Sequence, residues 1–190
     1  MNFSEQCFRI FEQATEAYHV TDNVDATVHN PYAVKSIEFY LYLKNWIDAV
    51  QWHLEDIIRN PEIDPVEALA IKRRIDKSNQ DRTDLVELID SFFLDKYKNV
   101  KVLPDATINT ESPAWAIDRL SILTLKIYHM REEASRPDAT AEHKARCEQK
   151  LAVLLEQKKD LSMALDQLLS DIRDGKKYIC LLYTSPSPRD

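Results

Sequence analysis

The sequence predicts an all-α protein, built as an antiparallel bundle of about five helices. Long apolar stripes recur at helical spacing, and prolines stand where helices begin. The sequence lacks the period-2 apolar alternation between glycine turns that would predict a sheet. It has one glycine, Gly175, in 190 residues, where average usage near 7% would give roughly thirteen. Phosphate-cradling loops, dinucleotide turns and nucleophile elbows need glycine, so these classes of site are excluded from residues 1–179.

Prolines set the order of the elements, because proline fits the first helical position but not the helix interior. A good N-cap residue precedes Pro31, Pro65 and Pro113. The predicted helices span residues 3–19, 31–59, 65–97, 113–134 and 139–177. The connection 98–112, of about fifteen residues, is longer than the usual loop of a bundle, and loops of that length are often functional.

Apolar stripes with alternating spacings of four and three residues support this division. In the second helix the stripe consists of Phe39, Leu43, Trp46, Val50, His53 and Ile57. Comparable stripes run from Ala68 to Phe92, from Ala116 to Met130 and from Cys147 to Ile172. Polar residues interrupt three of the four stripes, namely His53, Ser78, Arg82 and Lys158. Because a buried charge without a partner is costly, we expect these side chains to lie at the surface or to meet partners.

The composition limits the kinds of molecule that we expect this protein to bind and the compartment in which we expect it. The formal net charge of −7 argues against nucleic-acid binding, which depends on clustered lysine and arginine. The N-terminus lacks the pattern of a secretory signal, and no segment approaches the roughly 20 apolar residues of a membrane span. Three cysteines without metal-ligand spacing suit a reducing compartment. We therefore expect one cytoplasmic domain over residues 1–179.

The last eleven residues, CLLYTSPSPRD at 180–190, differ in texture from the rest of the chain. They match the translation of a transposase adapter used to prepare sequencing libraries. We expect that the genuine sequence stops near Tyr178 or Ile179 and continues differently in the intact protein, and that residues 180–190 are disordered.

The height of each residue along the bundle can be counted from the helix ends at a rise of about 1.5 Å per residue, and we call this height its level. Several polar residues on neighbouring helices fall at similar levels and so form one polar slab of the bundle. The slab contains Asn45, Trp46, Asn79, Arg82, Asp84, Lys126 and His129. The same levels place Asp118 a few turns away, near Asp90 and Lys158, with Glu111 just beyond.

These residues allow two interpretations. In the first, the positive charges of Arg82, Arg119 and Lys126 hold an anionic group such as a sugar phosphate, near Asn79. Asp118, Glu111 or His129 would then act as acid or base. In the second, Asp118, Arg119 and Arg82 form inter-helix salt bridges.

Two other features of the sequence concern metal binding and a partner surface. His53-x-x-Asp56 and Glu16-x-x-His19 have the i,i+3 spacing of metal ligands, but the levels separate His53 from His129 by roughly 13 Å. No metal or other cofactor is therefore predicted. Trp52 faces away from the stripe of its helix, toward polar residues, so we expect another helix or a partner to cover it.

Three stretches, at 46–59, 78–98 and 109–130, resemble the bacterial domain-of-unknown-function family 4254. They read WIDAVQWHLEDIIR, SNQDRTDLVELIDSFFLDKYK and NTESPAWAIDRLSILTLKIYHM, and the resemblance covers about residues 30–177. It implies a cytoplasmic helical protein whose relatives lie near genes for envelope-glycan glycosyltransferases, with no established catalytic residues to transfer.

Two classes of function remain. The leading hypothesis is a non-enzymatic binding or scaffold protein with a protein partner or a second copy of itself, linked to envelope-glycan biosynthesis. The alternative is an enzyme or small-ligand binder that uses the polar slab to hold an anionic molecule.

Overall fold

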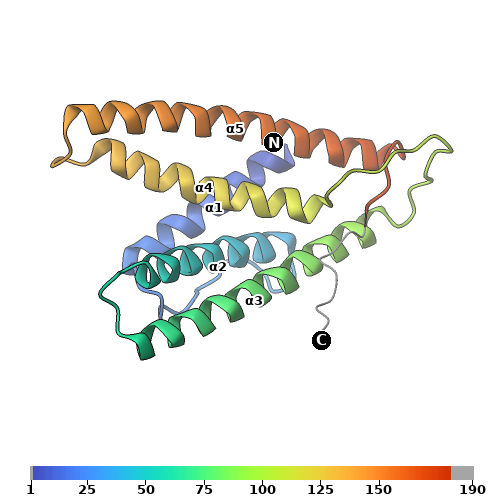
Figure 1. Cartoon of the computed structure of the whole chain (residues 1–190). Helices are drawn as coiled ribbons and strands as arrows, with labels where there is room; N and C mark the ends of the chain where they lie inside the picture. The colour runs from blue at the N-terminus through green and yellow to red at the C-terminus, as the bar shows by residue number, and fades with distance from the viewer. Residues whose placement is uncertain (1, 181–190) are drawn as a thin grey trace.

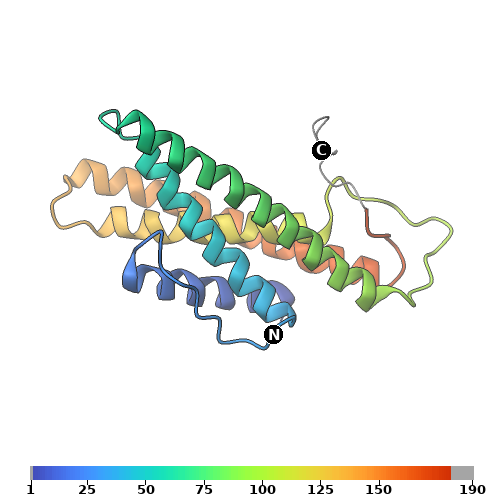
Figure 2. The ribbon, with the colours of Figure 1, turned by 90° about the horizontal axis from the view of Figure 1, so that it is seen from below.

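The computed structural model describes residues 2–180, and these form five helices without a strand, which confirms the predicted fold class (Figure 1). The helices are α1 (Phe3–Thr21), α2 (Ile37–Ile58), α3 (Pro65–Tyr97), α4 (Pro113–Ser135) and α5 (Ala141–Arg173). Two antiparallel hairpins, α2 with α3 and α4 with α5, form two layers, and α1 packs against α2, α4 and α5 (Figures 1 and 2). Residues 98–112 form the long connection between the layers, as predicted.

The helix starts follow the predicted caps at α3 and α4. Asp64 accepts hydrogen bonds from the amides of Val66 and Glu67, and Ser112 accepts one from the Trp115 amide. The start predicted for the second helix is wrong, because α2 begins at Ile37 with Ser36 as its N-cap. Asn30 instead accepts a hydrogen bond from the Tyr32 amide in a local turn.

The core draws on all five helices. Phe11, Leu41, Ile89, Leu120 and Leu165 are each almost fully buried in one cluster. The predicted stripes of the third, fourth and fifth helices face the interior, with their polar interruptions half-buried, and Ile71 and Ile75 of α3 pack with Leu54 in a second, smaller cluster. The stripe predicted for the second helix is wrong in its phase. Its members are half-buried except Trp46, and the deepest face of α2 carries Lys44, Asn45 and Asp48 beside Leu41 and Ala49.

The chain turns sharply at the end of α5. Gly175 has φ +73°, the amide of Lys176 donates to the Asp171 carbonyl at 2.8 Å, and the Gly175 amide donates to Ile172 at 3.1 Å. These two bonds define a Schellman motif, for which glycine is the preferred left-handed residue. The turn leads residues 175–178 onto the long connection, where the amides of Leu103 and Thr107 donate to the carbonyls of Gly175 and Lys176.

Two remaining predictions concern the ends of the chain and the membrane. Of the string 180–190, Cys180 is buried, and 181–190 lie outside the described residues. Within residues 2–180, no helix has the combination of length and apolar content that would let it traverse a bilayer.

Candidate functional site

Four charged side chains from three helices meet inside the bundle, and we call them the ionic layer: Lys44, Asp48, Arg82 and Asp118. Arg82 binds Asp118 through two hydrogen bonds, of 2.7 Å from Nε and 2.8 Å from a terminal nitrogen. Lys44 Nζ lies 2.9 Å from Asp118 and also donates to Asp48. Two positive and two negative charges therefore compensate each other within the layer.

Neutral polar groups extend the ionic layer to α1. The Ser121 hydroxyl donates to Asp48 at 2.6 Å, and the Asn45 amide donates to Ser121 Oγ at 3.1 Å. Thr15 Oγ1 in turn donates to the Asn45 carbonyl oxygen at 2.7 Å. Hydrogen bonds and ion pairs thus connect α1, α2 and α4 through buried groups and reach α3 at Arg82, which is half-buried.

Burial and charge act in opposite directions on the two carboxyl groups. Burial raises the pKa of Asp48 despite the nearby Lys44. Burial would raise the pKa of Asp118 as well, but the hydrogen bonds and charges of Arg82 and Lys44 together lower it. Asp118 is therefore the firmly ionised member of the pair.

The position predicted for Asp118 along the bundle is wrong, because this residue contacts Arg82 instead of lying a few turns away. Lys158 is not beside Asp118 either, since its Nζ lies 3.6 Å from the centre of the Phe8 ring. Levels cannot be counted from α3 to α4 across the connection 98–112, because α4 packs mainly against α5 and much less against α3 (Figure 1). Arg82 and Asp118 form the inter-helix ion pair that the second interpretation describes.

The other candidate residues lie apart from the ionic layer. Arg119 pairs with Glu111 at 3.0 Å, beside a cavity of about 620 Å³ between α4 and α5 that Lys126 also lines. Asn79 is exposed on α3 and accepts a hydrogen bond from Gln51 at 2.9 Å. The polar slab predicted from helix levels is therefore divided among several separate environments.

A second cavity, of about 480 Å³, lies between α2, α4 and α5, and we call it the apolar cavity. The cavity is lined by Trp52, Lys126, His129, Met130, Glu133, Lys150, Val153 and Leu154. Its volume falls within the range of about 300–1,000 Å³ that is usual for small-molecule sites. Lys126 also lines the neighbouring cavity, so the two adjoin along α4.

Trp52 is half-buried in this wall. Its ring stacks on that of His129, with 4.8 Å between centroids and an interplanar angle of 15°. Of the two expectations for Trp52, cover by another helix is met in part, because α4 supplies His129. Trp52 lines the apolar cavity and also a smaller cavity beside Arg82.

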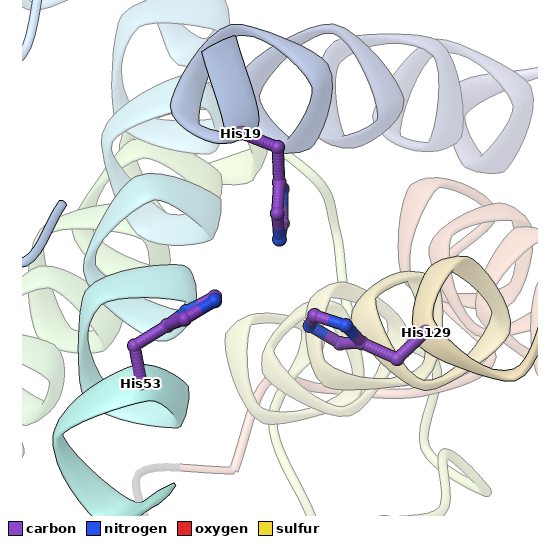
Figure 3. Close-up of side chains that lie close together, drawn as sticks. All are labelled: His19, His53 and His129. Carbon is purple, nitrogen blue, oxygen red and sulfur yellow. The ribbon is translucent and has the colours of Figure 1, made fainter. Parts of the chain in front are cut away.

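Three histidines from different helices point toward a common space, as Figure 3 shows. His19 comes from α1, His53 from α2 and His129 from α4, and one ring nitrogen of each lies within 4.8 Å of the others. The predicted separation of His53 from His129 is wrong, since their ring centroids lie 5.7 Å apart. Burial, with the neighbouring His19 and His53, lowers the pKa of His129.

Lys44, Asp48 and Ser121 are not among the residues predicted for a site, because the stripe predicted for the second helix puts the core on a different face of α2. The i,i+4 spacing of Lys44 and Asp48 on the same face as Leu41 is the signal that would have found them. His19 was seen only within a short motif, and nothing in the sequence joined it to the other histidines.

Fold and site together define an all-α two-layer protein with a buried ionic layer, an apolar cavity and a histidine cluster. The chain belongs to the family described as "Protein of unknown function (DUF4254)", whose model matches residues 38–180. The match contains α2–α5 and the ionic layer, whereas α1 precedes it. No curated protein and no solved structure is similar enough to the chain to count as a match.

Proposed function

We propose that this protein is a non-enzymatic binding protein that holds an amphipathic anion in the apolar cavity. The observation that supports this proposal is the composition of the wall, where Trp52, Met130, Val153 and Leu154 provide the apolar surface. Such a surface suits an alkyl or prenyl chain, because burying apolar area contributes about 25 cal/mol per Å².

The positive charge of the ligand site comes from Lys126 and Lys150. Among the described residues, neither side chain has a hydrogen-bond or ion-pair partner, although the protein carries a net charge of −7. An anionic head group at the cavity mouth would therefore meet two unpaired ammonium groups, whereas the Glu133 carboxylate of the same lining is paired with Arg136 and His143. Phosphate and carboxylate head groups share this chemistry.

The ionic layer supports the alternative function less well. An anionic ligand held by Arg82 would have to displace Asp118 from two hydrogen bonds and leave that buried carboxylate with Lys44 alone. Lys126 requires no such exchange. We infer the bacterial cytoplasm and envelope-glycan assembly as the setting, following the family resemblance.

Binding of decyl phosphate below its micelle concentration, measured by titration calorimetry, tests the proposal. We expect one molecule per chain and a loss of about 10- to 100-fold in affinity for Lys126→Ala, because a hydrogen bond to a charged group contributes about 1.5–3 kcal/mol. Val153→Glu should also weaken binding, since it places a negative charge in the apolar wall. Val153 is 58% exposed, so the fold should tolerate the change.

Two controls separate this site from non-specific adsorption. Lys101→Ala removes an exposed lysine of the long connection and should bind like the unchanged protein. Decyltrimethylammonium, which carries the opposite charge, should bind at least about 10-fold more weakly. Equal binding of both amphiphiles, or unaltered binding by Lys126→Ala, would rule out the proposed ligand class. In that case, co-purification of a protein partner would favour the scaffold role.

A further inference from the structure

We propose that His19, His53 and His129 form a binding site for one divalent transition-metal ion, with Zn²⁺ as the reference ion. The three residues come from α1, α2 and α4, and their candidate ligand atoms lie within 4.8 Å of one another (Figure 3). Imidazole nitrogen is a preferred ligand of zinc, copper and nickel ions. Three histidine ligands with a fourth position for water or another group form a known type of zinc site.

Hydrogen bonds orient two of the rings for this role. The Nδ1 atom of His19 lies 2.7 Å from the Thr15 carbonyl oxygen, and that of His53 lies 2.9 Å from the Ala49 carbonyl oxygen. A carbonyl oxygen only accepts, so each Nδ1 carries the proton and donates it. In the neutral ring, Nε2 then presents its lone pair. Metal-binding histidines in proteins are commonly fixed by a second hydrogen bond of this kind.

Of the three Nε2 atoms in the histidine cluster, two have no hydrogen-bond partner among the described residues. These are the Nε2 atoms of His19 and His129, and both are buried. Leaving a buried polar atom unpaired is unfavourable, and such atoms in native proteins usually have a partner. The Nδ1 atom of His129 lies 3.5 Å from a Glu132 carboxylate oxygen, and a proton on that Nδ1 leaves the lone pair on Nε2. A cation placed between the rings would then satisfy both lone pairs at once.

Asp22 supports the same conclusion at the third ring. Its carboxylate oxygen lies 3.0 Å from His53 Nε2, although Nδ1 of that ring already donates to Ala49. In a neutral His53, two acceptor atoms would face each other, and a shared cation removes this conflict. Asp22 is also the C-cap of α1 with φ +48°, a left-handed conformation that is uncommon outside glycine. We therefore infer that Asp22 supplies the fourth ligand.

Neighbouring aromatic rings restrict the motion of the cluster. His129 stacks on Trp52, and the His19 ring lies 4.3 Å from that of Tyr128. Tetrahedral zinc with bonds of about 2.0–2.1 Å requires ligand nitrogens about 3.3 Å apart. The ring nitrogens must therefore approach by at most about 1.5 Å, a distance within reach of side-chain rotation.

Titration calorimetry with Zn²⁺ on the full chain, purified without a histidine tag, tests the site. We expect one ion per chain. Replacing any one ligand, as in His19→Gln, His53→Gln or His129→Gln, should weaken binding by about 100-fold or more, since losing even an outer partner of a ligand costs about 10- to 100-fold. Replacing Zn²⁺ by Co²⁺ should give the strong visible absorption of a tetrahedral ion, and this absorption should disappear in the same variants.

The chain supplies a matched control in His29, which is exposed in the connection between α1 and α2. His29→Gln should bind Zn²⁺ within about twofold of the unchanged protein. His19→Gln is the decisive variant, because its ring has a single hydrogen bond and the change should leave the helical circular-dichroism spectrum intact. Absence of one-to-one binding, an equal loss in His29→Gln, or full affinity in a folded His19→Gln would each overturn the proposal. The amphiphile titration proceeds without metal, so either proposal can fail alone.

Discussion

Replacement of Lys44 by methionine should destabilise the protein strongly, because Lys44 is a cation of the ionic layer with no exposed surface. Its side chain is 0% exposed, and those of Asp48 and Asp118 are 4% and 3% exposed. Solvent therefore screens these charges little. Methionine fills a similar volume without the charge, so the variant leaves Arg82 alone to compensate two buried carboxylates.

Two estimates of the loss agree. Breaking a buried ion pair by removing one partner costs about 3–5 kcal/mol. Alternatively, the variant can protonate Asp48, the carboxyl group whose pKa burial already raises. Protonating a carboxyl group of ordinary pKa 3.8 at pH 7 costs about 4 kcal/mol, at about 1.4 kcal/mol per pH unit. A loss of about 4 kcal/mol is a large part of the 5–15 kcal/mol that stabilises a typical domain.

The second estimate also predicts the sign of the pH dependence. Folded Lys44→Met carries a proton on Asp48 that the unfolded chain lacks at pH 7, so its stability should increase as the pH falls toward 4. Denaturation by urea at several pH values measures this, and the deficit should shrink by about 1.4 kcal/mol per pH unit. The double variant Lys44→Met/Asp48→Asn should recover most of the stability at pH 7.

An exposed ion pair provides the control. Lys72→Met removes a lysine that pairs with Asp76 on the surface of α3, and it should cost no more than about 1 kcal/mol. A loss below about 1 kcal/mol for Lys44→Met, or a deficit that does not change with pH, would refute the reasoning about the ionic layer.

Two further predictions concern the ends of α3 and α5. Gly175→Ala should cost about 2–4 kcal/mol, because the residue is left-handed and its Cβ would lie 2.4 Å from the Lys101 carbonyl oxygen. Hydrogen exchange should then accelerate at the amides of Leu103 and Thr107, whereas unchanged exchange there would contradict the predicted coupling. Burial raises the pKa of Asp90, so the folded state binds a proton more tightly than the unfolded chain and its stability falls as the pH rises above 3.8. Asp90→Asn, which keeps an acceptor for the Ala114 amide, should therefore gain stability relative to the unchanged protein between pH 4 and pH 7 in urea denaturation, and a relative loss would be the contrary result.

The helices were predictable where a local signal determined them. Asp64 and Ser112 cap their helices by contacts within three residues, and Gly175 turns left-handed at the end of α5 for an equally local reason. The start of α2 was not predictable from Pro31. Asn30 there bonds the Tyr32 amide and the Phe39 carbonyl, and this competes with the role of a helix cap.

The sites depended on contacts between layers, which the sequence does not encode locally. Arg82 was recognised as a polar interruption, but its partner Asp118 was placed at the wrong level because the long connection breaks the count of turns. Lys44 was missed because each charge in the core is costly alone, and only the other members of the ionic layer make it acceptable. His53 and His129 were predicted to lie roughly 13 Å apart for the same reason.

The contact between the long connection and the end of α5 has a consequence for synthesis on the ribosome. Leu103 and Thr107 bond residues about seventy positions later, so these bonds cannot form until all five helices have been translated. Domains fold from the N-terminus at about 5–20 residues per second during synthesis. The α2–α3 layer can therefore assemble several seconds before residues 98–112 acquire their final path. During that interval residues 98–112 lack their hydrogen bonds to residues 175–176 and are accessible to a chaperone.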